Sequence, residues 1–258
     1  MPAYVSHTIM ARDVYNRINN KNVSLSYMLT YSLGGDLCKY SKCRYDSHHI
    51  KQDEFIYNIC DYMKEHDLIN DSECLGFLYG HICHLVMDNT IHPLIRCIDK
   101  NCIKNTSKIK SNHTLIELYY DNYFTNKKCN VRLDKYNYKE IFKAKTNKKI
   151  SKLINSVYDK TYNCKNVSKY YKYNLWLYKK VRYFLKIFSF NFLKSVTGIK
   201  KFLINNKNIN LSNDDRSINY NINNKNYNDN LDGLYELSVK EAVKYINRVD
   251  NYLKNSVK

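Results

Sequence analysis

Apolar side chains recur at helical spacing in several segments of the chain. In residues 7–18, for example, Ile9, Val14 and Ile18 are placed to share one face of a helix. The same periodicity predicts further helices in residues 54–66, 72–88, 113–124, about 138–160, 168–188 and 234–254.

Glycine and proline interrupt this pattern at two places. Gly34 and Gly35 follow one another after the first helix, and we expect them to break the helical run and open an irregular loop. Pro93 is expected to mark the end of the helical run that begins at residue 72. A stretch rich in Asn near residues 205–230 is expected to be a mobile loop.

Composition favours a single helical domain. The 258 residues include only six Gly and two Pro, the residues on which hairpins and sandwiches depend for their turns. No internal repeat is visible. We therefore expect an all-α fold with one domain over residues 1–258, whose candidate functional part is 1–125 and whose remaining helical part is 126–258.

The net charge of +18 raises the question of a nucleic-acid partner. Nearly all of the basic residues are Lys, interleaved with Asn, Tyr and Ile, the residue types that a compositionally biased genome over-supplies. A solvated surface accounts for this charge better than a specific nucleic-acid contact, because net charge alone specifies a partner weakly. No specific nucleic acid is expected, and the oligomeric state is left open.

The sequence carries no signal-peptide pattern at its start and no apolar run of spanning length, which predicts a cytoplasmic protein. Its nine cysteines contain no Cys-x-x-Cys pair and are expected to be small buried hydrophobes. The segment 174–204 is both aromatic and basic. It is interpreted as a core helix with Lys and Arg at its edge, ahead of a peripheral membrane contact.

Candidate metal ligands are concentrated in the stretch "GHICHLVMDNTIHP". His84 and Asp88 are four residues apart and share a helix face, and His81, three residues before His84, lies roughly on that face too. His92 is expected beyond the turn that follows Asp88. The surrounding residues are apolar, and a buried His or Asp must be paired or coordinate a cation. Imidazole and carboxylate together are typical ligands of zinc, with manganese or iron as alternatives.

A second pair of this kind, His113 and Glu117, occurs further along the chain, with Asp121 one turn later. Seven of the eight histidines lie within or close to such motifs, the exception being His66. The remaining candidates lie upstream and are His7, Asp36, His48 and His49.

In these motifs the chain resembles the zinc-dependent phospholipase C family, relatives of the fungal single-strand nucleases. The resemblance runs through "SHTIMARDV", "SLGGDL", "HHIKQDEFIYNICDYM", "LGFLYGHICHLVMDNTIHPLI", "NHTLIELYYDNYF" and "LSVKEAVKYI". It covers most of the chain, and its specific part is the order His, Asp, His, His-x3-Asp, His, His-x3-Glu. It implies an all-α fold that holds two to three Zn²⁺ ions per chain.

The resemblance also implies roles for individual residues. One zinc would be held by Asp36, His84 and either His48 or His49, while Asp88 would bridge this ion to a second one bound by His7. A further zinc would be held by His92, His113 and Glu117. Asp36 would orient or deprotonate the attacking water. His81 is interpreted as a packed neighbour of the site, and Asp121 as an acceptor that supports a ligand.

Two departures from the family pattern concern the first part of the chain. Asp36 follows Gly35 directly, where the family has Gly-Pro before the acid, so a looser loop is expected. Secreted members bind zinc through an N-terminal Trp, whereas this chain begins Met1-Pro2, and the nitrogen of Pro2 would be the substitute after loss of Met1.

The function implied is hydrolysis of a phospholipid or another phosphodiester by a metal-activated water. Two alternatives remain open at this point. The same cluster would serve a nuclease, or the metal would stabilise a helical binding protein without catalysis.

Overall fold

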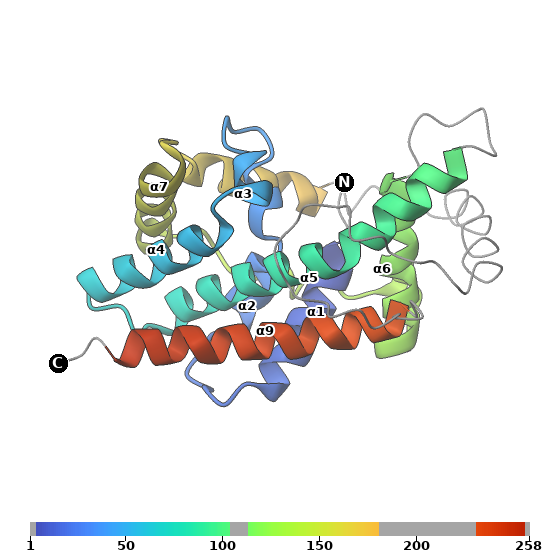
Figure 1. Cartoon of the computed structure of the whole chain (residues 1–258), viewed down its shortest axis with the longest axis horizontal. Coiled ribbons are helices and arrows are strands. Elements are labelled where there is room, and N and C mark those ends of the chain that lie inside the picture. The colour runs from blue at the N-terminus through green and yellow to red at the C-terminus, as the bar shows by residue number, and fades with distance from the viewer. Residues whose placement is uncertain (1–3, 104–112, 181–230, 256–258) are drawn as a thin grey trace.

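The computed structural model describes residues 4–103, 113–180 and 231–255, together with the side chains of all of these except 96–103 and 113–115. In these ranges the chain forms helices joined by turns and loops, without a β-strand, which confirms the all-α prediction (Figure 1). Residues 168–180 are also helical. The remaining elements are α1 (Tyr4–Arg17), α2 (Leu25–Tyr31), the 3₁₀-helix η1 (Gly34–Cys38), α3 (Asp46–His49), α4 (Gln52–Glu65), α5 (Ser72–Ile103), α6 (His113–Cys129), the 3₁₀-helix η2 (Leu133–Lys135), α7 (Lys148–Tyr162) and α9 (Leu231–Lys254).

Helix α5 runs through the middle of the molecule and packs against α2 on one side and α9 on another (Figure 1). Its backbone comes very close to α2, because a Cβ atom on Gly80 would lie 2.7 Å from the carbonyl oxygen of Met28. Any larger residue at this position would push the two helices apart. Helix α1 completes the centre by contacting α2, α5, α6 and α9.

Helix α1 is anchored to α6 at its first turn. The backbone N–H and the hydroxyl of Ser6 both donate to Oδ1 of Asp121, each at 2.7 Å. A carboxylate at this place satisfies a backbone donor that the helix itself leaves without a partner, and it complements the positive end of the helix dipole. The position of His7, the next residue, is therefore fixed against α6.

Helix α5 does not end near Pro93, so that prediction was wrong. The helix continues to Ile103, for 32 residues in all. Ile91, Leu94 and Ile95 keep the apolar spacing on both sides of the proline and are 2–3% exposed. Proline removes one backbone hydrogen bond, and the burial of this face compensates for that loss.

The helix expected near 138–160 begins ten residues later than predicted, at Lys148. Residues 138–147 form turns instead. The start is set by Asn147, whose side-chain oxygen accepts from the backbone N–H of Ile150 at 2.9 Å, an N-cap that fixes the first turn.

None of the described helices is long and apolar enough to cross a bilayer. The Asn-rich stretch at 205–230, the residues Met1 and Pro2, and the larger part of the 174–204 segment lie outside the described residues.

Candidate metal centre

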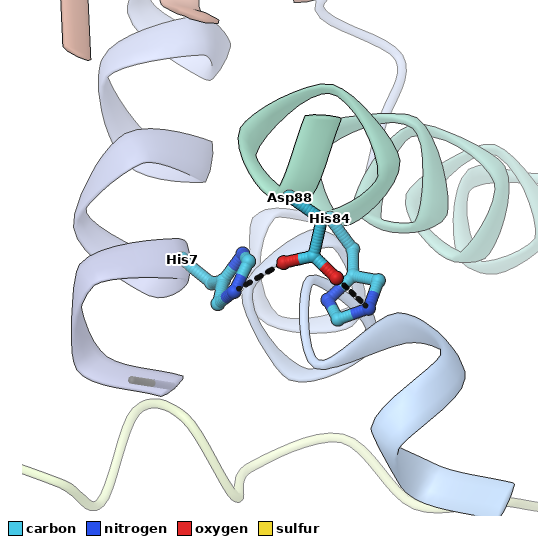
Figure 2. A group of neighbouring side chains, drawn as sticks. All are labelled: His7, His84 and Asp88. Atoms are coloured by element: carbon cyan, nitrogen blue, oxygen red, sulfur yellow. Dashed lines mark ion pairs between the residues drawn. The ribbon is translucent and has the colours of Figure 1, made fainter. Parts of the chain in front are cut away.

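Five elements bring predicted ligands to one place in the molecule. His7 comes from α1, Asp36 from η1, His48 from α3, Glu117 from α6, and the remaining three from α5. Those on α5 are His84, Asp88 and His92, which follow each other at intervals of four residues and so share one helix face. Figure 2 shows the carboxylate of Asp88 between the rings of His7 and His84.

Asp88 is the hub of this cluster. Its Oδ1 lies 3.2 Å from Nε2 of His7 and 3.2 Å from Nε2 of His92, while its Oδ2 lies 3.4 Å from Nε2 of His84. A second carboxylate pairing places Oδ1 of Asp36 3.4 Å from Nε2 of His48. The imidazoles of His7, His84 and His92 thus surround the Asp88 carboxylate. The imidazole of His48 faces the Asp36 carboxylate.

Backbone carbonyl groups define which nitrogen of two rings carries the proton. Nδ1–H of His84 donates to the carbonyl of Ser32 at 3.2 Å, and Nδ1–H of His48 donates to the carbonyl of Arg44 at 2.8 Å. In the neutral imidazole the other nitrogen, Nε2, then bears a lone pair. The lone pair of His84 is directed toward Oδ2 of Asp88, so two acceptors face each other there.

Several buried polar atoms in the cluster have no hydrogen-bond partner among the residues that the structure describes. They are Nε2 of His84, Oδ1 of Asp88 and Nδ1 of His7. Such atoms are costly unless something else satisfies them. A cation between the imidazole nitrogens and the carboxylates would satisfy Nε2 of His84 and Oδ1 of Asp88, and the residues present therefore fit a metal ion.

Ligand-type atoms lie within 4.8 Å of one another in two groups of the described residues. One group contains His7, His84 and Asp88, and the other contains Asp36, His48 and His84. His84 belongs to both, so the two groups adjoin. The donors are imidazole nitrogens and carboxylate oxygens, a set suited to zinc.

Gly34 provides the space for His84. A Cβ atom at this position would lie 2.2 Å from Cγ of the His84 ring, and the backbone has a φ angle of +45°. Side chains other than glycine rarely adopt this conformation. Glycine at position 34 thus allows the η1 loop to pack directly against the imidazole of His84.

Charge and burial have opposing effects on these groups. Burial lowers the pKa of His84 to about 4 despite the neighbouring Asp88, which keeps its ring neutral. Burial alone would raise the pKa of Asp88, but His84 and His92 hold it well below its usual value. Asp36 overcomes the effect of burial on His48 and raises the pKa of that ring to about 9. A protonated His48 ring therefore balances the charge of the Asp36 carboxylate.

Four other candidates are placed differently. His49 is exposed and packs on Tyr45, with ring centroids 4.6 Å apart. His81 is buried, with Nδ1–H donating to the carbonyl of Phe77 at 2.9 Å and Nε2 lying 2.8 Å from the hydroxyl of Tyr171. His66 is exposed and directly follows the last residue of α4. The side chain of His113, at the first residue of α6, lies outside the described part of the chain.

The structure brings Glu117 next to the cluster as well. Its side chain is buried, and Oε1 lies 3.9 Å from Nε2 of His92. Asp121, expected to support a ligand ring, accepts both donors of Ser6. It positions the backbone next to His7 and in that way serves the cluster indirectly.

Two supporting residues were missed from the sequence. Nδ2–H of Asn174 donates to the carbonyl of Leu37 at 2.9 Å, and the hydroxyl of Tyr178 donates to the carbonyl of Asp36 at 3.2 Å. Both come from the helix of residues 168–180, far along the chain. Their spacing of four residues was visible, but nothing in it indicated a contact with the η1 loop.

A cleft that opens to solvent lies beside the cluster. Its polar wall includes His48, His84 and Asp88, and its apolar wall includes Phe55 and Leu85. A small molecule in this cleft would contact the polar ligand side chains with its polar group and Phe55 or Leu85 with its apolar part.

Comparison of the chain with protein-family models, with curated proteins and with solved structures gives no match.

Proposed function

We propose that the protein is a zinc-dependent phosphodiester hydrolase of the phospholipase C type. The observation that carries the proposal is the convergence of His7, His84 and His92 on Asp88, with buried ligand atoms that no hydrogen bond satisfies. Purely structural ion pairs would be expected to have their polar atoms satisfied.

The residues that would hold zinc form adjoining groups. Asp36, His48 and His84 would hold one ion, and His7 with Asp88 a second, as the resemblance implies. A further ion would be held by His92, Glu117 and His113. Bound zinc supplies a water acidified toward a pKa of about 7 and positive charge for the phosphodiester oxygens.

Asp36 is the candidate to orient or deprotonate the attacking water. Burial would raise its pKa, but His48 and His84 lower it overall, so the carboxylate is ionised at neutral pH and able to accept a proton. Its carbonyl is held by the Tyr178 hydroxyl. The side chain contacts His48, which lines the cleft, so a substrate in the cleft would lie within reach.

The lipid nature of the substrate rests on the family resemblance, since the cluster itself supports phosphodiester hydrolysis in general. The cleft agrees with such a substrate, because the apolar side chains of Phe55, Ile56 and Leu85 line it together with the ligand side chains. These apolar side chains would also limit the access of bulk water to the reacting phosphate.

The test is hydrolysis of phosphatidylcholine and of a chromogenic phosphocholine ester by the zinc-loaded protein. Asp36→Asn is expected to lower kcat by about 10²–10⁴-fold. Asp159→Asn, the same atomic change on an exposed part of α7, is the matched control and is expected to retain full activity. Zinc content is measured for both variants, so that loss of a ligand is distinguished from loss of the base.

Three results would contradict the proposal. Absence of turnover by fully zinc-loaded wild type would refute hydrolysis of these substrates. Cleavage of single-stranded nucleic acid alone would favour the nuclease alternative. Unfolding on zinc removal without cleavage of any phosphodiester would favour a structural metal.

A further inference from the structure

The outward face of the helix of residues 168–180 exposes aromatic side chains. Trp176 is 55% exposed and Tyr173 is 49% exposed. Tyr40, from the loop that follows η1, is 53% exposed and lies against this helix, with its ring centroid 5.8 Å from that of Tyr173. The Tyr173 centroid is in turn 6.1 Å from that of Trp176. Three large aromatic rings thus form one continuous exposed patch. Single exposed apolar residues are common on protein surfaces, whereas a continuous patch indicates a contact surface.

The inner face of the same helix is occupied. Tyr171, Asn174 and Tyr178 are at most 1% exposed. Asn174 and Tyr178 donate to backbone carbonyls of the η1 loop, which fixes the orientation of the helix. Over residues 174–180, the described part of the segment interpreted as a core helix, one face is therefore buried and the opposite face is directed outward.

Lysines surround the exposed rings. Lys169, Lys172 and Lys179 are exposed and lie three or four residues from Tyr173 or Trp176, so they share one side of the helix with them. The sequence has no Asp or Glu from residue 160 to 180 or from 37 to 45. We call this surface the Trp176 face and define it by Tyr40, Lys169, Lys172, Tyr173, Trp176 and Lys179.

We propose that the Trp176 face docks the protein on a membrane surface that contains anionic phospholipids. Trp and Tyr are suited to the headgroup layer, because each ring has an apolar body and a polar tip. Lysines beside them are attracted to anionic headgroups. The inference goes beyond the proposed function, because it uses none of the metal ligands and no catalytic step.

Docking through this face would also place the metal centre near the membrane. The helix that carries Trp176 contacts the η1 loop directly through Asn174 and Tyr178, and this loop carries Asp36. The cleft beside the cluster contains none of the residues of the Trp176 face. Membrane contact would therefore leave the cleft open.

A single-stranded nucleic acid fits this surface less well. Base stacking requires open ring faces along a basic groove. Here Tyr40 and Tyr173 meet at 70°, edge against face, so that they cover part of one another. The half-exposed rings of Tyr173 and Trp176 protrude from a helix.

The chain itself provides the reporter for the test, because Trp176 is its only tryptophan. The full-length zinc-loaded protein is titrated with vesicles of phosphatidylcholine alone or mixed with phosphatidylglycerol. We expect the tryptophan emission to shift to shorter wavelength with the mixed vesicles, and the response to weaken at high salt because charge attraction is screened. Vesicles without anionic lipid are expected to give a much smaller response.

Variants locate the contact by co-sedimentation with the mixed vesicles. Lys169→Glu with Lys172→Glu, and separately Tyr173→Ser with Trp176→Ser, are each expected to lower the partition coefficient by about tenfold or more. The control is Lys240→Glu with Lys254→Glu, an equal change in charge on exposed positions of α9. This helix runs along the bottom of Figure 1, whereas the helix of residues 168–180, in orange, lies near the top. The control is expected to bind nearly as well as wild type.

Three outcomes would overturn the proposal: no binding to mixed vesicles, equal loss of binding in the control, or a tryptophan response to a single-stranded oligonucleotide without one to vesicles. Hydrolysis of the soluble chromogenic ester is measured in parallel. Turnover without vesicle binding refutes docking alone, and vesicle binding without turnover refutes the proposed function alone.

Discussion

Gly34 is the residue on which the packing of the cluster depends most directly. It allows the η1 loop to lie against the ring of His84, whose Nε2 is buried without a hydrogen-bond partner. The carbonyl of Ser32, just before this glycine, also fixes the proton on Nδ1 of the same ring. The η1 loop and the ring of His84 therefore depend on each other for their positions, and a substitution in either should displace both.

We predict that Gly34→Ala destabilises the protein by about 2–4 kcal/mol, because the new Cβ would clash with His84 and the backbone would be strained at its positive φ. Its zinc content should fall as well. Gly233→Ala is the control, since a Cβ there meets nothing within 4 Å. Urea unfolding and metal analysis test both variants, and equal stability of the two would contradict the account.

His81 illustrates a different use of a buried imidazole. Both of its nitrogens have protein partners, and the chain of contacts continues from Tyr171 to the hydroxyl of Tyr158 at 2.8 Å. Burial lowers the pKa of His81 to about 3. The ring is therefore neutral in the folded protein at any pH at which the protein is expected to function.

This gives a pH dependence of defined sign. The unfolded chain protonates His81 below about pH 6.5, whereas the folded protein resists protonation down to about pH 3, so stability is present above 6.5 and is lost as the pH falls. The loss should reach about 1.4 kcal/mol per pH unit. His81→Gln should flatten the curve of unfolding free energy between pH 7 and 5 relative to wild type. Parallel curves for the two proteins would show that the ring is not held neutral.

At the scale of the elements, helix α5 provides three of the candidate ligands and passes through Pro93 without ending. The proline lacks the N–H that would bond to the carbonyl of Asn89. Buried apolar residues on either side hold the helix together.

We predict that Pro93→Ala raises the free energy of unfolding by about 1–3 kcal/mol, because alanine restores the backbone hydrogen bond and favours the helix. Denaturant unfolding of the zinc-loaded protein measures the change. An unchanged or lower stability would mean that the proline ring itself contributes essential packing.

The sequence predicted those helices that have one apolar face, such as α4 and α9. Helix α2 was missed because Tyr27 to Tyr31 are all buried, so the segment shows no alternation between apolar and polar sides. The turns at 138–147 were predicted as helix because Tyr138, Ile141 and Phe142 have the spacing of residues on one helix face. Local spacing does not reveal that Asn147 caps the true start.

The candidate site was predictable to a similar degree. His84 and Asp88 followed from their spacing of four residues, since a helix determines which of its side chains share a face. The choice between His48 and His49 could not be made from spacing, because adjacent residues point in different directions. The outcome depends on how α3 packs against Asp36. Nor did spacing show that Asp121 would bond to Ser6, a contact between distant segments.

At the scale of the whole molecule, the cluster connects parts of the chain that are far apart. His7, Asp88 and Glu117 bring α1, α5 and α6 together at one point. In the absence of a cation their buried polar atoms would oppose this arrangement, so bound metal should stabilise the entire fold. A ligand present at 100 times its Kd adds about 2.7 kcal/mol to the free energy of unfolding.

The most direct test of the account is elemental analysis of the purified protein, counting zinc per chain, with Asp88→Asn analysed alongside. Asp88 faces three imidazoles, so the account predicts about two to three zinc ions in the wild type and at least one fewer in the variant. A wild type without bound metal, or a variant with an unchanged metal content, would contradict the central claim.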